Sequence, residues 1–138
     1  MRILPFLLAL VGTACSTTAP PDATALVGRY MRARINARDD PDWRGIVGDW
    51  QAEYRGDGHL IVRGAHGLDV DSLWSLAGDV LTLTDMAGSG ACRLDGVDAA
   101  SGRYRIRFIG DELHFVVLRD ECAGRRSVLL THPLRRIR

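Results

Sequence analysis

Lysine is absent from this chain, because all 18 basic residues among its 138 residues are arginines. The absence excludes a lysine Schiff base and a lysine that holds a phosphate. An excess of charge of one sign is missing as well, since the formal net charge is +1. A dedicated nucleic-acid-binding protein normally carries a basic excess or a basic stripe. We therefore expect no nucleic acid among the partners of this protein.

The chain also lacks an apolar run long enough to cross a bilayer as a helix, which takes about 20 residues. A shorter apolar run at residues 3–11 follows Arg2 and precedes three small residues at 12–14. A positive residue, an apolar stretch and small residues in this order are typical of a cleavable export signal. We predict that residues 1–14 are a signal peptide and that the protein is exported.

The residues before Cys15 resemble the lipobox of bacterial lipoproteins, in which the cysteine becomes the lipid-modified first residue of the mature protein. Gly12 stands where that family usually has leucine, so a plain secretory peptide with an incidental cysteine is the alternative. The resemblance implies lipidation of Cys15 and a membrane partner through this anchor. It also implies the periplasmic face of the outer membrane in a Gram-negative cell, because Ser16 rather than Asp follows the cysteine. Residues 15–25 then form a flexible tether.

Cysteines number three, an odd count. If Cys15 carries a lipid, Cys92 and Cys122 are left as a pair, and an oxidising compartment favours a disulfide between them. A bridge that closes about 30 residues contributes about 3–4 kcal/mol in the chain-entropy model. The alternative is a catalytic or metal-binding thiol, but neither cysteine has the neighbours that such a thiol requires.

Apolar residues recur with a period of two through most of the chain, which predicts half-buried β-strands. Residues 103–109 and 112–119 form the clearest pair, joined by a Gly-Asp turn. Their side chains expected to face the interior are Tyr104, Ile106, Phe108, Leu113, Phe115 and Val117. The other predicted strands are residues 50–55, 59–63, 72–76, 80–85, 127–131 and 134–138.

The segment at residues 26–35 fits two interpretations. Its apolar spacing fits a helical stripe for which Asp22 is a possible N-cap. A strand is the other interpretation, and it is the one that the family resemblance given below favours. With this segment as a strand, the chain holds about eight or nine short antiparallel strands and few residues for helices. Such a meander tends to close into an up-and-down barrel, which removes exposed edges. We predict an all-β fold, with a barrel domain at residues 26–138.

Several short motifs share glycine-bearing turns or strand starts: Gly48-Asp49-Trp50, Gly-Asp-Gly at 56–58, the hairpin at 75–85, Gly-Arg-Tyr at 102–104, Gly-Asp-Glu-Leu at 110–113 and Asp-x-Cys-x-Gly-Arg at 120–125. In order and spacing they resemble the lipocalin-like (calycin-type) small β-barrel lipoproteins of bacteria, a largely uncharacterised family. The resemblance covers about residues 27–136. It implies a barrel that holds a small apolar or amphipathic ligand.

The resemblance also implies that Trp50 packs near the barrel floor beneath a basic side chain. The arginines available for this contact are Arg125, Arg135 and Arg136. The aromatic residues expected to contact a ligand are Trp43, Trp50, Trp74, Tyr104, Phe108 and Phe115. The alternative function is a protein-interaction or inhibitor module with a packed core, no ligand and an envelope protein as partner. In either case we expect a monomer.

The sequence shows no convergent set of catalytic or metal-binding residues. Its histidines fall on different predicted strands and loops: His59, His66, His114 and His132. A zinc site needs three or four ligands that converge. Ser72 and Ser127 lack the Gly-x-Ser-x-Gly context of an activated serine. We therefore expect no metal, no cofactor and no enzymatic activity.

Overall fold

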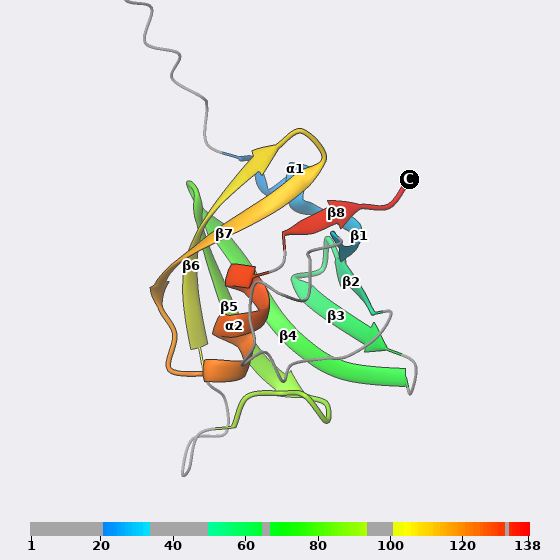
Figure 1. Cartoon of the computed structure of the whole chain (residues 1–138), viewed down its shortest axis with the longest axis vertical. Helices are drawn as coiled ribbons and strands as arrows, with labels where there is room; N and C mark the ends of the chain where they lie inside the picture. The colour runs from blue at the N-terminus through cyan, green and yellow to red at the C-terminus, as the bar shows by residue number, and fades with distance from the viewer. Residues whose placement is uncertain (1–20, 34–49, 65–66, 94–100, 132) are drawn as a thin grey trace, which may run out of the picture.

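The structure is a computed structural model that describes residues 21–33, 50–64, 67–93, 101–131 and 133–138. Its elements in chain order are α1 (Ala23–Leu26), β1 (Gly28–Arg32), β2 (Gln51–Tyr54), β3 (His59–Gly64), β4 (Gly67–Ala77), β5 (Val80–Ala87), β6 (Ser101–Ile109), β7 (Glu112–Arg119), α2 (Ala123–Thr131) and β8 (Leu134–Arg136). Each strand pairs antiparallel with the next, and β1 pairs with β8 to close the barrel (Figure 1). The predicted all-β barrel is confirmed.

The predicted strands pair as three hairpins: residues 50–55 and 59–63 correspond to β2–β3, residues 72–76 and 80–85 to β4–β5, and residues 103–109 and 112–119 to β6–β7. Each turn carries glycine, and Gly78 and Gly110 have φ of 63° and 62°, a conformation that other residues rarely adopt. On β6 the side chains of Tyr104 and Ile106 are fully buried, while the arginines between them are exposed. The inward face of this hairpin is therefore the face that the alternation predicts.

The described part of the ambiguous segment, residues 26–33, combines both interpretations of its sequence. Asp22 caps the short helix α1, since its carboxylate accepts a hydrogen bond from the backbone N–H of Thr24 at 2.9 Å. Leu26 ends this helix and is completely buried. The chain then extends into β1, which starts at Gly28. The last residues of the expected tether therefore belong to α1.

Residues 127–131 are not a strand, contrary to the sequence prediction, but the second half of helix α2. Buried or cavity-lining residues of this region recur three or four positions apart, as on one face of a helix: Cys122, Arg125, Val128 and Leu129. The last strand is confirmed but is shorter than predicted, at Leu134–Arg136. Among the described residues, neither helix has the length and apolar character that would let it span a membrane.

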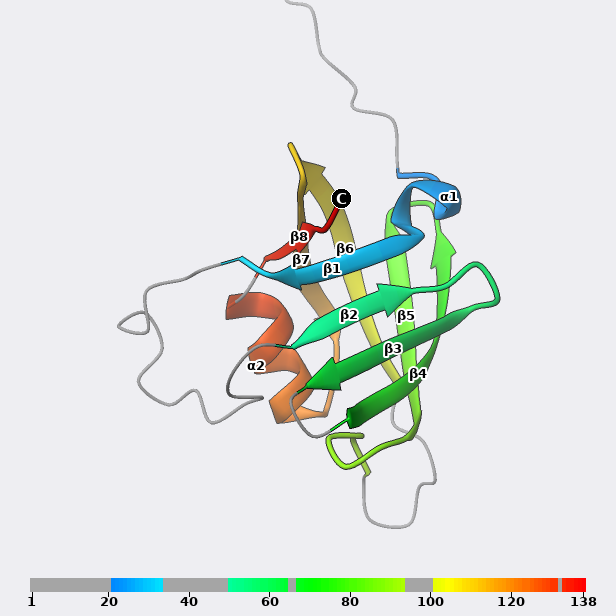
Figure 2. The same cartoon turned by 90° about the vertical axis from the view of Figure 1, so that its right-hand side faces the viewer.

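The two helices lie at opposite ends of the barrel (Figure 2). At the α1 end, Arg136 of β8 lies over the ring of Tyr30 at 5.2 Å and near that of Phe108 at 5.9 Å. Its guanidinium also donates to the Tyr30 hydroxyl at 2.7 Å, and this hydroxyl donates to the Leu26 carbonyl at 2.8 Å. Gly28 faces the Arg136 side chain. These contacts close the α1 end.

The arginine expected above Trp50 therefore covers a different aromatic ring. Trp50 directly precedes β2, the second strand, whereas the first strand carries Tyr30. Because β1 rather than β2 pairs with β8, the Arg136 side chain reaches Tyr30 and not Trp50. Arg125 contacts carboxylates instead. The expectation that one of these arginines covers Trp50 is therefore wrong, because the ring that Arg136 covers is that of Tyr30.

Candidate functional site

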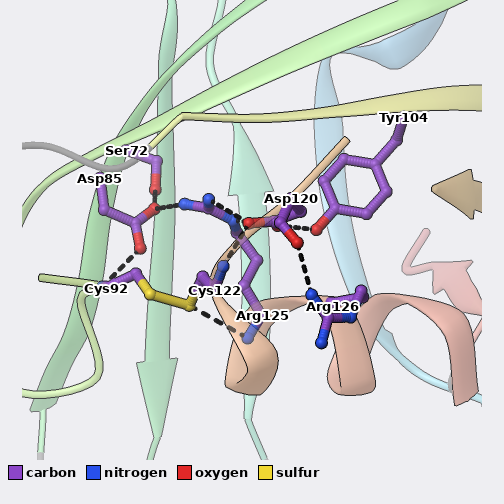
Figure 3. Close-up of a disulfide and its surroundings, with 8 residues drawn as sticks. All are labelled: Ser72, Asp85, Cys92, Tyr104, Asp120, Cys122, Arg125 and Arg126. Atoms are coloured by element: carbon purple, nitrogen blue, oxygen red, sulfur yellow. Dashed lines mark hydrogen bonds and ion pairs between the residues drawn. A yellow bond between two sulfur atoms is a disulfide. The ribbon is translucent and has the colours of Figure 1, made fainter. Parts of the chain in front are cut away.

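The α2 end is held by a disulfide between Cys92 and Cys122, which confirms the predicted pairing. Their Cα atoms lie 6.0 Å apart, and the bridge joins the segment after β5 to the residue just before α2 (Figure 3). The backbone N–H of Arg125 donates to the Cys122 sulfur at 3.5 Å. The first turn of α2 is therefore fixed to the barrel covalently.

Arg125, on the first turn of α2, lies between two buried carboxylates. Its Nε and Nη2 donate to the two oxygens of Asp120, each at 2.8 Å, and its Nη1 lies 3.0 Å from Oδ1 of Asp85. The Arg125 side chain is 9% exposed, and that of Asp120 is fully buried. A planar guanidinium matches a carboxylate in this two-point arrangement. We call Asp85, Asp120, Arg125 and the Cys92–Cys122 bridge the α2 staple.

Further hydrogen bonds satisfy both carboxylates of the α2 staple. Asp85 accepts from the Ser72 hydroxyl and from the backbone N–H of Cys92 at 2.7 Å. Asp120 accepts from the Tyr104 hydroxyl and from the backbone N–H of Cys122 at 2.8 Å. All of these groups appear together in Figure 3. Such complete satisfaction is what keeps buried charges stable.

The pKa values of the staple follow from this arrangement. Burial alone would raise the pKa of Asp120, but hydrogen bonds from Arg125, Tyr104 and Cys122 outweigh it and the pKa is lowered. Burial would lower the pKa of Arg125, whereas its carboxylate partners raise it above the usual value. The pair is therefore ionised at neutral pH.

Gly102 of β6 makes room for the staple. A Cβ atom at this position would lie 2.5 Å from Oδ2 of Asp120 and 3.0 Å from Nη2 of Arg125. The first distance is shorter than Cβ atoms show in proteins, and the second is tighter than most Cβ contacts. Glycine at 102 is therefore required by the close approach of the Asp120–Arg125 pair to the strand.

Between β2, β3, β4, β5 and α2 the barrel contains a half-open cavity of about 520 Å³. Two rows of paired residues on neighbouring strands form its wall. One row runs across the sheet through Tyr54, Leu60, Ser72 and Asp85, and the other through Ala52, Val62 and Val70. The remaining wall includes Trp50, Leu83, Val128, Leu129 and Leu134. The cavity is mainly apolar, and its size lies within the range of small-molecule sites.

Two polar atoms on the cavity-lining residues are buried without a hydrogen-bond partner among the described residues. They are the indole Nε1 of Trp50 and the hydroxyl of Tyr54. Trp50 is 4% exposed and Tyr54 is 1% exposed. Burial raises the pKa of Tyr54, and the neighbouring Tyr30 and Tyr104 raise it further, so the phenol stays protonated. Both groups are therefore hydrogen-bond donors for which the described part of the chain supplies no acceptor.

Of the aromatic residues expected at a ligand, only Trp50 lines the cavity among those that the structure describes. Trp74 packs its ring edge-on against Tyr54 at 5.8 Å, and its Nε1 donates to the carbonyls of Arg55 and His59 at 3.1 and 3.2 Å. It fixes the β2–β3 turn and stands behind Tyr54. Trp43 lies outside the described residues, as does Cys15.

The other three expected ligand residues are in the core, beyond the cavity wall. Tyr104 is fully buried and donates its hydroxyl to Asp120, and Phe115 packs edge-on against the Tyr104 ring at 6.2 Å. Phe108 lies at the α1 end beside Arg136. The predicted inward face is thus confirmed, but its aromatic rings pack in the core or at the α1 end and do not line the cavity.

Sequence reasoning missed the polar part of the cavity wall. Ser72 and Asp85 occupy inward positions on strands whose other inward residues are apolar. A polar residue that breaks an apolar alternation is the signal that marks them. Tyr54 belongs to the predicted strand β2. That its hydroxyl is buried without a partner among the described residues depends on the tertiary packing and could not be predicted from the sequence.

The fold and the cavity define the class of small antiparallel barrels that are closed at one end and hollow at the other. Comparisons with protein-family models, with curated proteins and with solved structures find no match to this chain. Any function must therefore be argued from the cavity and from the sequence.

Proposed function

We propose that this protein is an exported, lipid-anchored envelope protein that binds a small apolar or amphipathic molecule in its barrel, as the lipocalin-like resemblance implies. The observation that carries the binding proposal is the half-open, mainly apolar cavity of about 520 Å³. A barrel that served only as a packed interaction module would fill this space with side chains. The cavity therefore favours ligand binding over the interaction or inhibitor module.

The α2 staple supports the same proposal. Its charged groups satisfy one another, so Asp85 contributes to the cavity wall without an unpaired charge. A bridge and a buried ion pair at one end preserve a hollow shape that hydrophobic packing alone would tend to collapse. Preformed sites bind small molecules with a low ordering cost.

The export and anchoring part of the proposal is supported by residues 1–15 and by the cysteine arrangement. Cys92 and Cys122 are bridged, and stable disulfides are typical of compartments outside the cytoplasm. The bridge leaves Cys15 as the third cysteine, available for the lipid. The lipidation test is metabolic labelling of expressing bacteria with radioactive palmitate.

Palmitate labelling is expected for the full chain and not for Cys15→Ser, with membrane association lost in the variant. Cys92→Ser is the matched control, because it removes a cysteine that the proposal does not place on the lipid. Equal labelling of Cys15→Ser and the full chain would contradict lipidation at this residue.

Ligand binding is tested by native mass spectrometry after the barrel has been exposed to a total bacterial lipid extract. The decisive variant is Val62→Phe, which adds a ring to the cavity wall beside the small residues Ala52 and Val70. Val116→Phe is the matched control, since Val116 is 52% exposed on β7 and does not line the cavity. Melting curves verify that both variants fold.

The proposal expects bound small molecules on the unmodified chain and on Val116→Phe, and their loss on Val62→Phe. A barrel that retains nothing, or a Val62→Phe variant that retains as much as its control, would refute ligand binding in the cavity.

A further inference from the structure

The core of the barrel contains three buried tyrosines, and one of them differs from the others. The Tyr30 hydroxyl has both an acceptor, the Leu26 carbonyl, and a donor, Arg136. The Tyr104 hydroxyl donates to Asp120. The Tyr54 hydroxyl has no partner among the described residues, although Tyr54 is 1% exposed and its ring packs edge-on against Tyr30 at 5.7 Å.

An orphaned donor at this depth is costly unless something accepts its hydrogen bond. Leaving a buried polar group unpaired costs about as much as a lost hydrogen bond, and native cores rarely leave one without a reason. Tyr54 differs from the other two tyrosines in lining the cavity. An occupant of the cavity is therefore the candidate for the acceptor that the described residues do not supply.

We propose that the cavity takes a neutral, mainly apolar molecule carrying a carbonyl or ether oxygen, and that this oxygen accepts a hydrogen bond from the Tyr54 hydroxyl. This inference rests on the proposed ligand-binding function and adds the chemistry of the ligand. The Tyr54 hydroxyl is buried and out of contact with solvent, so the proposal requires the side chain to turn about its Cα–Cβ bond, which moves the hydroxyl toward the bound molecule. The Trp50 indole N–H offers a second donor, four residues away on the same face of the chain.

The charges around Tyr54 argue for a neutral oxygen over a carboxylate. Asp85 lies in the same row of the wall as Tyr54, and the Arg125 guanidinium is already shared between Asp85 and Asp120. With an anionic group bound in that row, three negative charges would share the single guanidinium of Arg125. A buried charge without a counter-charge is strongly disfavoured.

The test uses three probes of nearly the same shape in fluorescence titrations with the folded barrel. They are 2-acetylnaphthalene, which carries a neutral carbonyl, 2-ethylnaphthalene, which has no oxygen, and 2-naphthoate, which is an anion. One neutral hydrogen bond is expected to make the ketone bind about five-fold tighter than the hydrocarbon. The anion is expected to bind most weakly of the three.

The decisive variant is Tyr54→Phe, which removes one hydroxyl group and retains the ring. It is expected to abolish the preference for the ketone over the hydrocarbon while leaving hydrocarbon binding unchanged. Its melting temperature is expected to stay the same or rise, because the deleted hydroxyl has no partner to lose. A loss of fold therefore cannot account for the lost preference.

Tyr30→Phe is the matched control, since it deletes a buried hydroxyl that has two partners. It is expected to lower the melting temperature and to preserve the preference for the ketone. If Tyr54→Phe retains that preference, or if the anion binds tightest, the inferred ligand chemistry is wrong while the binding function stands. If none of the three probes binds the unmodified barrel, the proposed function itself fails.

Discussion

The two ends of the barrel use the same materials, arginine and tyrosine, in different ways. At the α1 end, Arg136 lies over Tyr30 and its hydrogen bonds satisfy the hydroxyl of that ring. At the α2 end, Arg125 is held by carboxylates in the wall and at the start of the helix, and a cavity remains beside it. One arginine fills its end of the barrel, whereas the other holds a helix against a hollow. At the binding end, the charged groups pair with one another and the space beside them stays open. At the closed end, the arginine side chain itself occupies the space.

The largest expected effect is that of Arg125→Met. The substitution leaves the carboxylates of Asp85 and Asp120 buried without their cation, which costs about 3–5 kcal/mol. Urea denaturation of the variant and of the unmodified chain measures the difference. Arg107→Met, on the exposed outer face of β6, is the control and should stay within about 0.5 kcal/mol. Equal losses of unfolding free energy in the two variants would show that Arg125 in the α2 staple stabilises the fold no more than an exposed arginine does.

The next effect is that of removing the bridge with the double variant Cys92→Ala/Cys122→Ala. A loop of this length contributes about 3–4 kcal/mol through the entropy of the unfolded chain. Because the bridge also holds α2, binding of 2-acetylnaphthalene should weaken along with stability. The unmodified chain under reducing conditions should match the double variant. A loss below about 1 kcal/mol would mean that the ion pair alone fixes the helix.

Acid should affect the α2 end through Asp120. The pKa of Asp120 is lower in the folded protein than in the unfolded chain, so its contribution is complete above the unfolded value of about 4 and is lost as the pH falls through the folded value. Urea denaturation between pH 7 and pH 3 should therefore show stability that is level above about pH 5 and declines below about pH 4. In Asp120→Asn the decline should be shallower, and an unchanged decline would assign the acid sensitivity to other carboxylates.

The smallest effect is expected at the closed end, from Arg136→Met. The variant loses the contacts of the guanidinium with the Tyr30 and Phe108 rings and its hydrogen bonds to the Tyr30 hydroxyl and the Ala25 carbonyl. At this partly exposed site we expect a loss of about 1–2 kcal/mol. The control Arg138→Met removes an exposed arginine nearby and should have little effect. Because Arg136 does not line the cavity, Arg136→Met should leave probe binding unchanged. A large drop in probe affinity would mean that the two ends are coupled.

The strands could be predicted from the sequence because each hairpin repeats a two-residue alternation that ends in a glycine turn. Residues 103–119 illustrate this, since the exposed arginines and buried aromatic residues of β6 leave only one register for the core face. The pairing of Cys92 with Cys122 could be predicted as well, because an assumed lipid on Cys15 leaves two cysteines. Both inferences depend on local pattern or on counting.

Helix α2 and the site could not be predicted in the same way. Residues 127–131 form a short apolar run that fits a strand or a helix, and the inward face of α2 carries Arg125, a residue type that normally marks the solvent side. The partners of Arg125 come from β5 and from the end of β7, so only the closed barrel brings them together. The resemblance of Gly48-Asp49-Trp50 to a lipocalin motif places a basic side chain over Trp50, whereas in the structure Trp50 precedes β2 and the strand paired with β8 is β1, which carries Tyr30.

The most direct test of the account is to locate the probe in the barrel. A titration of the ¹⁵N-labelled protein with 2-acetylnaphthalene, followed by NMR, reports which backbone amides change. The account predicts that shifts gather at Ala52, Val70 and Leu129 on the walls of the cavity and are absent at the β6–β7 turn, around Gly110. Shifts centred on the α1 end or on the outer faces of the strands, with the cavity walls unchanged, would contradict it.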